Sequence, residues 1–216
     1  MMHQNGAVGA ETSGEREPWS WAATDDEVEE RRRHVRRLVG HRIGAVRYCT
    51  IDFRRGEFRP DLVDGGPRFI EDEAEWEDPS WRHAGFDAVD HGVEFETESG
   101  LVFSLTWDPP GDREGIGLRN VAMPDAYMNR EAAHAIWSVG DRSHTWAPLS
   151  EAPITDVQLH YYPWEGRVSG FWCPHITLHT AAASVHVVLG DASNGALAHS
   201  SDNIAVLHPA TSVPDW

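Results

Sequence analysis

The chain contains no lysine, and all 18 of its basic residues are arginine. Its 35 acidic residues give a formal net charge of −17. A field of this sign repels a phosphate backbone, so composition argues against nucleic-acid binding. It favours solubility or a basic protein partner. The exclusive use of arginine is typical of GC-rich coding sequences and indicates a bacterial source.

Cysteines and long apolar runs are also scarce. Only Cys49 and Cys173 are present, which excludes a four-thiolate zinc site and predicts two reduced thiols. No run of 18 apolar residues occurs, and the first residues lack the charged-then-apolar layout of a signal peptide. We therefore expect a soluble, cytoplasmic protein with no membrane partner.

Known catalytic signatures are missing. The sequence has no G-x-S-x-G, no H-E-x-x-H and no Walker loop. Gly115-Ile116-Gly117 is a fragment of a dinucleotide fingerprint, but it lacks the strand, turn and helix that such a fingerprint needs. Function must therefore be inferred from the fold and from clusters of reactive side chains.

Alternating apolar and polar residues dominate what is present. Around residues 175–189, this period of two predicts a hairpin of half-buried strands. A single apolar face requires Leu178 to lie opposite Val185 and Ile176 opposite Val187. Residues 156–162 alternate in the same way, so we expect them to form a neighbouring strand.

A second hairpin is predicted at residues 92–108. Phe95 facing Phe103 and Val93 facing Leu105 require a three-residue loop that ends at Gly100, where glycine is favoured. Between the N-terminal region and this hairpin, residues 58–90 are rich in proline, glycine and acidic residues. They predict a long loop with one helical turn at 72–76, of the kind that often forms a lid or a binding loop.

These patterns predict a mainly β protein, an antiparallel two-sheet sandwich or flattened barrel with one N-terminal helix. The helix should begin after Thr24, which forms a capping box with Glu27. Residues 1–23 are polar and aperiodic and predict a disordered tail, which leaves 24–216 as a single β-rich domain. Residues 38–48 and 149–159 share Leu, Ile and Val at matching places, and each precedes a hairpin, so an internal duplication is a further hypothesis.

The predicted hairpin register gathers histidines on the face away from the apolar layer. His175 and His186 should lie near each other, and His160 should join them from the neighbouring strand. Such a cluster suits acid–base catalysis, or a divalent metal if two or three imidazoles converge. His179 would stand about 13 Å from His175, too far to share an ion with it. The alternative is a solvated or aromatic-covered sheet face.

Ten tryptophans predict either a thick core or an aromatic cleft. Candidate ligand-binding residues fall in the acidic turn after residues 92–108 and at the entrance to the later hairpin. They are Trp107, Asp108, Asp112, Glu114, Tyr162, Trp164 and Trp172.

Two functions of different class follow from these observations. The first is a small-molecule-binding protein, or an enzyme acting on an organic metabolite, in which His160, His175 and His186 supply acid–base or metal-assisted chemistry in a Trp/Tyr-rich cleft. Beyond a divalent metal, no cofactor is indicated. The alternative is an acidic, non-enzymatic inhibitor or immunity-type protein that its charge steers onto a basic protein.

Overall fold

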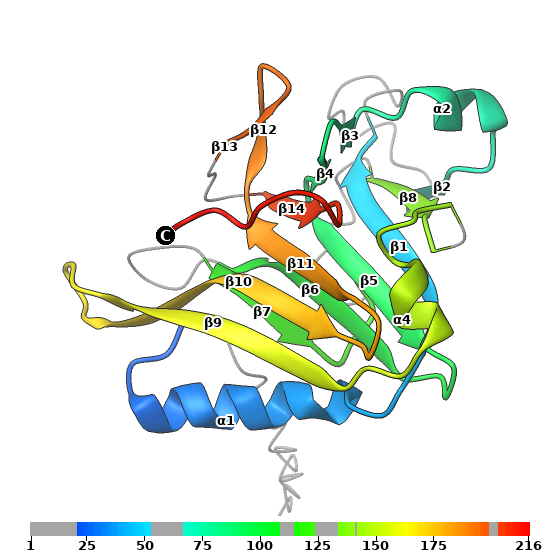
Figure 1. Ribbon diagram of the computed structural model, residues 1–216. Coiled ribbons are helices and arrows are strands. Elements are labelled where there is room, and N and C mark those ends of the chain that lie inside the picture. Colours follow the sequence, from blue (N-terminus) through cyan, green and yellow to red (C-terminus); the bar gives the residue numbers. More distant parts are fainter. Residues whose placement is uncertain (1–20, 53–66, 109–114, 124–133, 141, 199–202) are drawn as a thin grey trace, which may run out of the picture.

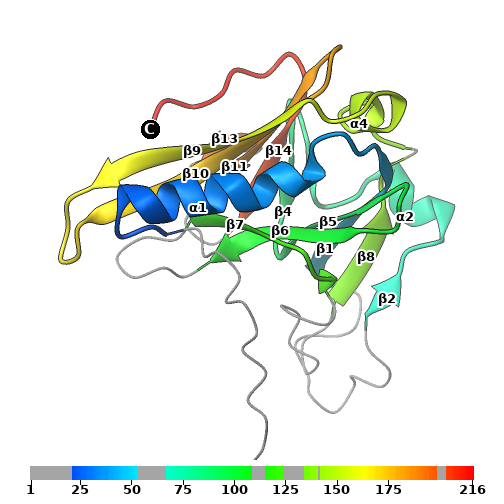
Figure 2. The same cartoon turned by 90° about the horizontal axis from the view of Figure 1, so that it is seen from below.

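The computed structural model describes residues 21–52, 67–108, 115–123, 134–140, 142–198 and 203–216. In these stretches two six-stranded sheets pack face to face as a sandwich (Figures 1 and 2). The prediction of a mainly β, two-sheet protein with one N-terminal helix is confirmed. Within the described residues neither sheet closes on itself, so the fold is a sandwich and not a barrel.

The first sheet is antiparallel except where β2 and β8 run parallel. Its strands, in spatial order, are β2 (Arg68–Phe69), β8 (His134–Ser138), β1 (Ile43–Ile51), β5 (Gly92–Thr97), β6 (Val102–Asp108) and β7 (Gly115–Arg119). The hairpin of β5 and β6 has the predicted register, with Phe95 opposite Phe103 and Val93 opposite Leu105. Gly100 adopts the left-handed conformation that its loop requires, with φ of 83°.

The second sheet is antiparallel throughout. Its strands, in spatial order, are β3 (Arg82–His83), β4 (Phe86–Val89), β14 (Ile204–Leu207), β11 (Ser184–Leu189), β10 (Gly170–His179) and β9 (Asp156–Trp164). The predicted pairs Leu178–Val185 and Ile176–Val187 are both present. A separate small hairpin, β12 (Asp191–Ser193) and β13 (Ala196–Ala198), follows β11.

Helix α1 (Asp25–Val35) begins as the capping box predicts. The Thr24 side chain accepts a hydrogen bond from the Glu27 amide, and the Glu27 carboxylate accepts one from the Ala23 amide. A 3-10 turn (Arg36–Leu38) continues α1, and the helix runs alongside edge strand β9 (Figures 1 and 2). Just before α1, Ala22 is buried and pairs with Phe171, so residues 21–23 of the predicted disordered tail belong to the fold. Residues 1–20 of that tail lie outside the described residues.

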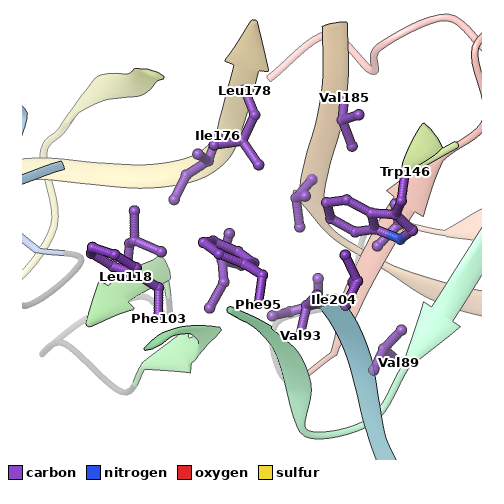
Figure 3. Close-up of a cluster of buried hydrophobic side chains, with 14 of the residues drawn as sticks. Val89, Val93, Phe95, Phe103, Leu118, Trp146, Ile176, Leu178, Val185 and Ile204 are labelled. Atoms are coloured by element: carbon purple, nitrogen blue, oxygen red, sulfur yellow. The ribbon is translucent and has the colours of Figure 1, made fainter. Parts of the chain in front are cut away.

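The core lies between the two sheets. Side chains from the facing strands interdigitate there, and Figure 3 shows Phe95, Phe103 and Leu118 of the first sheet against Ile176 and Leu178 of the second. Trp146, which precedes the short helix α4 (Ala147–Glu151), is 1% exposed and closes one end of this layer. Burial of aromatic and branched side chains at about 25 cal/mol per Å² is the main force that holds the sheets together.

The predicted long loop at 58–90 is wrong in its second half. The helical turn predicted at 72–76 is confirmed as the short helix α2 (Glu73–Glu77). The strands β2, β3 and β4 were not predicted, and β4 is an internal strand buried at every position. Phe86 and Ala88 pack on the outer face of the second sheet, against the C-terminal segment. Asp87 has its side chain on the other face, and this buried carboxylate interrupts the apolar pattern that would have identified the strand.

The two sheets share an arrangement that fits the duplication hypothesis. In the first sheet β1 pairs with β5 of its hairpin, and in the second β9 pairs with β10 of its own. A common origin of the two halves remains a prediction. None of the helices in the described residues is long and apolar enough to cross a bilayer.

Candidate functional site

The predicted histidine cluster is present on the outer face of the second sheet. The rings of His160 and His175 stack with centroids 4.0 Å apart and an interplanar angle of 5°. His175 Nε2 lies 3.0 Å from His186 Nδ1. Thr177 Oγ1 lies between the rings, at 2.8 Å from His160 Nε2, 3.0 Å from His175 Nε2 and 3.2 Å from His186 Nδ1.

Burial holds these imidazoles neutral. It lowers the pKa of His175 to about 3, and the neighbouring imidazoles lower it further because they disfavour a second positive charge. Burial likewise lowers the pKa of His160 and His186. His175 is only 4% exposed, so a substrate has little access to its ring. The clustering of the three histidines is confirmed, and their catalytic role remains a prediction.

Metal binding finds little support in this cluster. Within the described stretches, no group of three or more His, Cys, Asp or Glu side chains is arranged so that it could hold a metal ion. His179 is occupied elsewhere, with Nδ1 2.7 Å from Ser184 Oγ.

Those predicted ligand-binding residues that the structure describes do not form one cleft. Tyr162 lines a groove of 550 Å³ between α1 and β9, which His160 also reaches. Trp164 and Trp172 pack edge to face, and Trp172 packs on Trp216. Trp107, in β6, instead donates its indole N–H to the Asp90 carbonyl. Asp112 and Glu114 lie outside the described residues, as does the side chain of Asp108.

A second cavity, of 340 Å³, brings together polar groups that the sequence analysis did not select. We call it the Asp87 cavity. It is lined by Trp76, Trp81, Arg82, Asp87, Val139, Arg142, Ser143, His144, Thr145, His208 and Pro209. Four of these residues come from the 58–90 segment, which was predicted to be a long loop.

A chain of hydrogen bonds joins the two sheets beside this cavity. Trp146 donates its indole N–H to the Tyr48 hydroxyl at 2.8 Å, and Tyr48 donates to Asp87 Oδ2 at 2.8 Å. His208 Nε2 lies 3.0 Å from Asp87 Oδ1. Because an indole can only donate and a carboxylate can only accept, the donor and the acceptor of each hydrogen bond in this network are fixed. Tyr48 comes from β1 of the first sheet and Asp87 from β4 of the second.

The buried members of this chain differ from His208 in their exposure. Tyr48 is fully buried, and burial, followed by the charge of Asp87, raises its pKa well above 10, so it remains a phenol. The Asp87 side chain is 4% exposed, whereas that of His208 is 32% exposed. The network thus holds a rigid carboxylate inside and presents one imidazole to the cavity.

Aromatic rings and guanidinium groups form the rest of the lining. Trp76 and Trp81 pack edge to face with centroids 6.1 Å apart. The Arg142 guanidinium lies over Trp76 at 4.5 Å, and that of Arg82 lies over Trp81 at 5.1 Å. The buried indole N–H of Trp81 has no hydrogen-bond partner in the described part of the chain.

The sequence held one signal for this site. Asp87 is a lone acidic residue between apolar neighbours in Phe86-Asp87-Ala88-Val89, and a buried carboxylate needs donors around it. Nothing local indicates that Tyr48 and His208 supply them, because these three residues meet only through the packing of one sheet on the other.

Comparison with known proteins adds no functional information. No family model, no curated protein and no solved structure matches this chain.

Proposed function

We propose that this chain binds a small organic molecule in the Asp87 cavity and that His208 acts on it as an acid–base group. One observation carries the proposal: an accessible imidazole is hydrogen-bonded to a buried carboxylate at the wall of a 340 Å³ cavity. Cavities of about 300–1,000 Å³ with mostly apolar walls and a few convergent polar groups are the usual form of small-molecule sites.

The chemistry follows from the donor and acceptor roles. Since Asp87 only accepts, neutral His208 carries its hydrogen on Nε2 and keeps a lone pair on Nδ1. Nδ1 can then take a proton from a bound molecule, and Asp87 balances the charge of the imidazolium that forms. Tyr48 and Trp146 hold the carboxylate in place, as a positioned acid–base pair requires.

The larger groove beside α1 is a weaker candidate. Its lining places Glu29 and Asp156 with Arg32 and Arg36, so the charges largely offset one another. Of the described residues in its lining, His160 alone is a histidine, and its ring is already engaged with Thr177.

A fragment screen by NMR tests the proposal. In ¹⁵N-labelled protein, the indole N–H of each of the ten tryptophans gives its own signal. Fragments that bind should shift the Trp81 signal and the ring signals of His208. His208→Gln should weaken these fragments and His175→Gln should not. Fragments that shift only Trp164 and Trp172, or that bind equally well to both variants, would overturn the assignment of the site.

A further inference from the structure

The lining of the Asp87 cavity is positive although the chain is strongly negative. Arg82 and Arg142 contribute two guanidinium groups, and among the described residues of the lining Asp87 contributes the only carboxylate. That carboxylate already accepts hydrogen bonds from Tyr48 and His208. In a chain of net charge −17, such a local excess of positive charge favours an anionic ligand.

Hydrogen-bond donors remain available at this site. Within the described part of the chain, Arg82 makes one long hydrogen bond, 3.5 Å to the Trp76 carbonyl, out of the five N–H groups that an arginine carries. Arg142 uses two nitrogens on Glu73, whose side chain is 76% exposed and can therefore yield to a competitor. Trp81 also lines the cavity, but its indole N–H is buried. Guanidinium donors of this kind suit the two oxygens of a planar carboxylate.

The size of the cavity and its apolar walls limit the rest of the ligand. Apart from the polar groups already named, the lining includes Trp76, Val139 and Pro209. A volume of 340 Å³ lies at the small end of the range for ligand sites. An apolar body of about one ring fits such a space.

Resting on the proposed function, we infer that the ligand is a small monocarboxylate with an apolar, ring-sized body. Its carboxylate contacts Arg82 and Arg142, and its body lies toward His208. Among the described lining residues, two guanidinium groups face the one carboxylate of Asp87, so one negative charge is matched when the ligand displaces the exposed Glu73 from Arg142. A carboxylate carries that charge, whereas a phosphate dianion exceeds it.

Titrations of the full chain with benzoate, benzamide and inorganic phosphate test this inference. Benzamide has the shape of benzoate without its charge. Benzoate should bind about tenfold more tightly than benzamide, because a charged carboxylate makes stronger hydrogen bonds to guanidinium groups than a neutral amide does. Arg82→Gln should remove this preference. Arg32→Gln, which deletes the same charge in the groove beside α1, should leave it intact.

Two unfavourable results have different meanings. If benzamide binds as tightly as benzoate, or phosphate binds more tightly, while the Trp81 signal still shifts, the ligand class is wrong and the cavity remains the site. If none of the three probes, nor any fragment from the wider screen, shifts Trp81 or His208, both the ligand class and the proposed function are overturned.

Discussion

Two groups of histidines in this protein illustrate how surroundings decide what an imidazole can do. On the outer face of the second sheet, His160, His175 and His186 contact one another and Thr177. At the Asp87 cavity, a single imidazole, His208, contacts a buried carboxylate. The first group has more histidines, whereas the second pairs an imidazole with a carboxylate.

The difference is one of charge balance and access. Protonation of any ring in the cluster places a positive charge beside other imidazoles in a partly buried layer, which is why their pKa values are lowered. Protonation of His208 places the charge beside Asp87. The cluster is therefore suited to staying neutral, whereas the Asp87–His208 pair is the one to which we assign the proposed acid–base function.

The largest expected effect on stability comes from removing the hydroxyl of Tyr48, which lies at the centre of the hydrogen-bond network beside the Asp87 cavity. The matching change in the histidine cluster removes the hydroxyl of Thr177. Tyr48→Phe leaves the Trp146 N–H without its acceptor and removes one donor from the buried Asp87 carboxylate. We expect it to lower the free energy of unfolding by about 2–4 kcal/mol, since each orphaned buried group costs about 1–3 kcal/mol. Thr177→Val should cost less, because His175 and His186 still contact each other.

Urea unfolding at pH 7 measures both variants. Tyr162→Phe, in the groove beside α1, is the control for the loss of a phenol hydroxyl, and a change within about 0.5 kcal/mol is expected for it. Equal losses for Tyr48→Phe and Thr177→Val would remove the energetic contrast between the two groups.

A smaller loss of stability is expected when the pH is lowered, and it tests the histidine cluster alone. The pKa of His175 is about 3 in the folded protein and near 6.5 when unfolded, so the unfolded chain takes up the proton first. The contribution of His175 to stability is fully present above pH 6.5 and is lost as the pH falls toward the folded value. Between pH 7 and pH 4 this loss should amount to roughly 1–3 kcal/mol.

His175→Gln should flatten that dependence. Urea unfolding of the wild type and the variant at pH 7, 5.5 and 4.5 gives the comparison. Carboxylates elsewhere titrate in both proteins, so only the difference between the two curves reports on His175. Parallel curves would show that the cluster does not oppose protonation.

The contrast also explains which parts of the molecule the sequence could predict. The histidine cluster lies on strands β9, β10 and β11, which are neighbours in one sheet, and the apolar alternation of those strands determines their register. The same reasoning predicted the pairs of the β5–β6 hairpin and the capping box of α1. Period and turn chemistry are local, so one sequence is enough to read them.

The Asp87 cavity depends on a different kind of contact. Tyr48, Asp87 and His208 come from β1, β4 and the residue after β14, and they meet because one sheet packs on the other. No strand register within a sheet determines that packing. The buried Asp87 carboxylate also interrupts the apolar pattern of β4, which is why this strand was predicted to be part of a loop.

Chemical labelling can measure how accessible the imidazoles of His208 and His175 are to a reagent in solution. Diethyl pyrocarbonate reacts with neutral imidazoles that it can reach. His208, with a side chain 32% exposed, should be modified at least about tenfold faster than His175, whose residue is 4% exposed. Mass spectrometry of the digested protein gives both rates from one sample. Faster labelling of His175 would mean that the cluster, and not the Asp87 cavity, presents the reactive imidazole.

The smallest expected effect on stability concerns two exposed ion pairs, one beside each region. Glu73 pairs with Arg142 at the Asp87 cavity, and Glu29 pairs with Arg32 in the groove beside α1. Exposed pairs of this kind contribute little to stability because water and salt screen them. Glu73→Gln and Glu29→Gln should therefore leave the thermal midpoint unchanged within error.

The two variants should nevertheless differ in ligand binding. Glu73→Gln frees the Arg142 guanidinium from a competing carboxylate, so benzoate should bind more tightly to it than to the wild type, and the gain should shrink as salt is added. Glu29→Gln changes the net charge by the same amount, and it should change benzoate affinity far less. If both variants gain equally, the effect is the overall field of the chain and Arg142 has no special part in it. A gain in benzoate affinity for Glu73→Gln alone would mean that, in the free protein, the Glu73 carboxylate occupies the position that the ligand carboxylate takes when it binds.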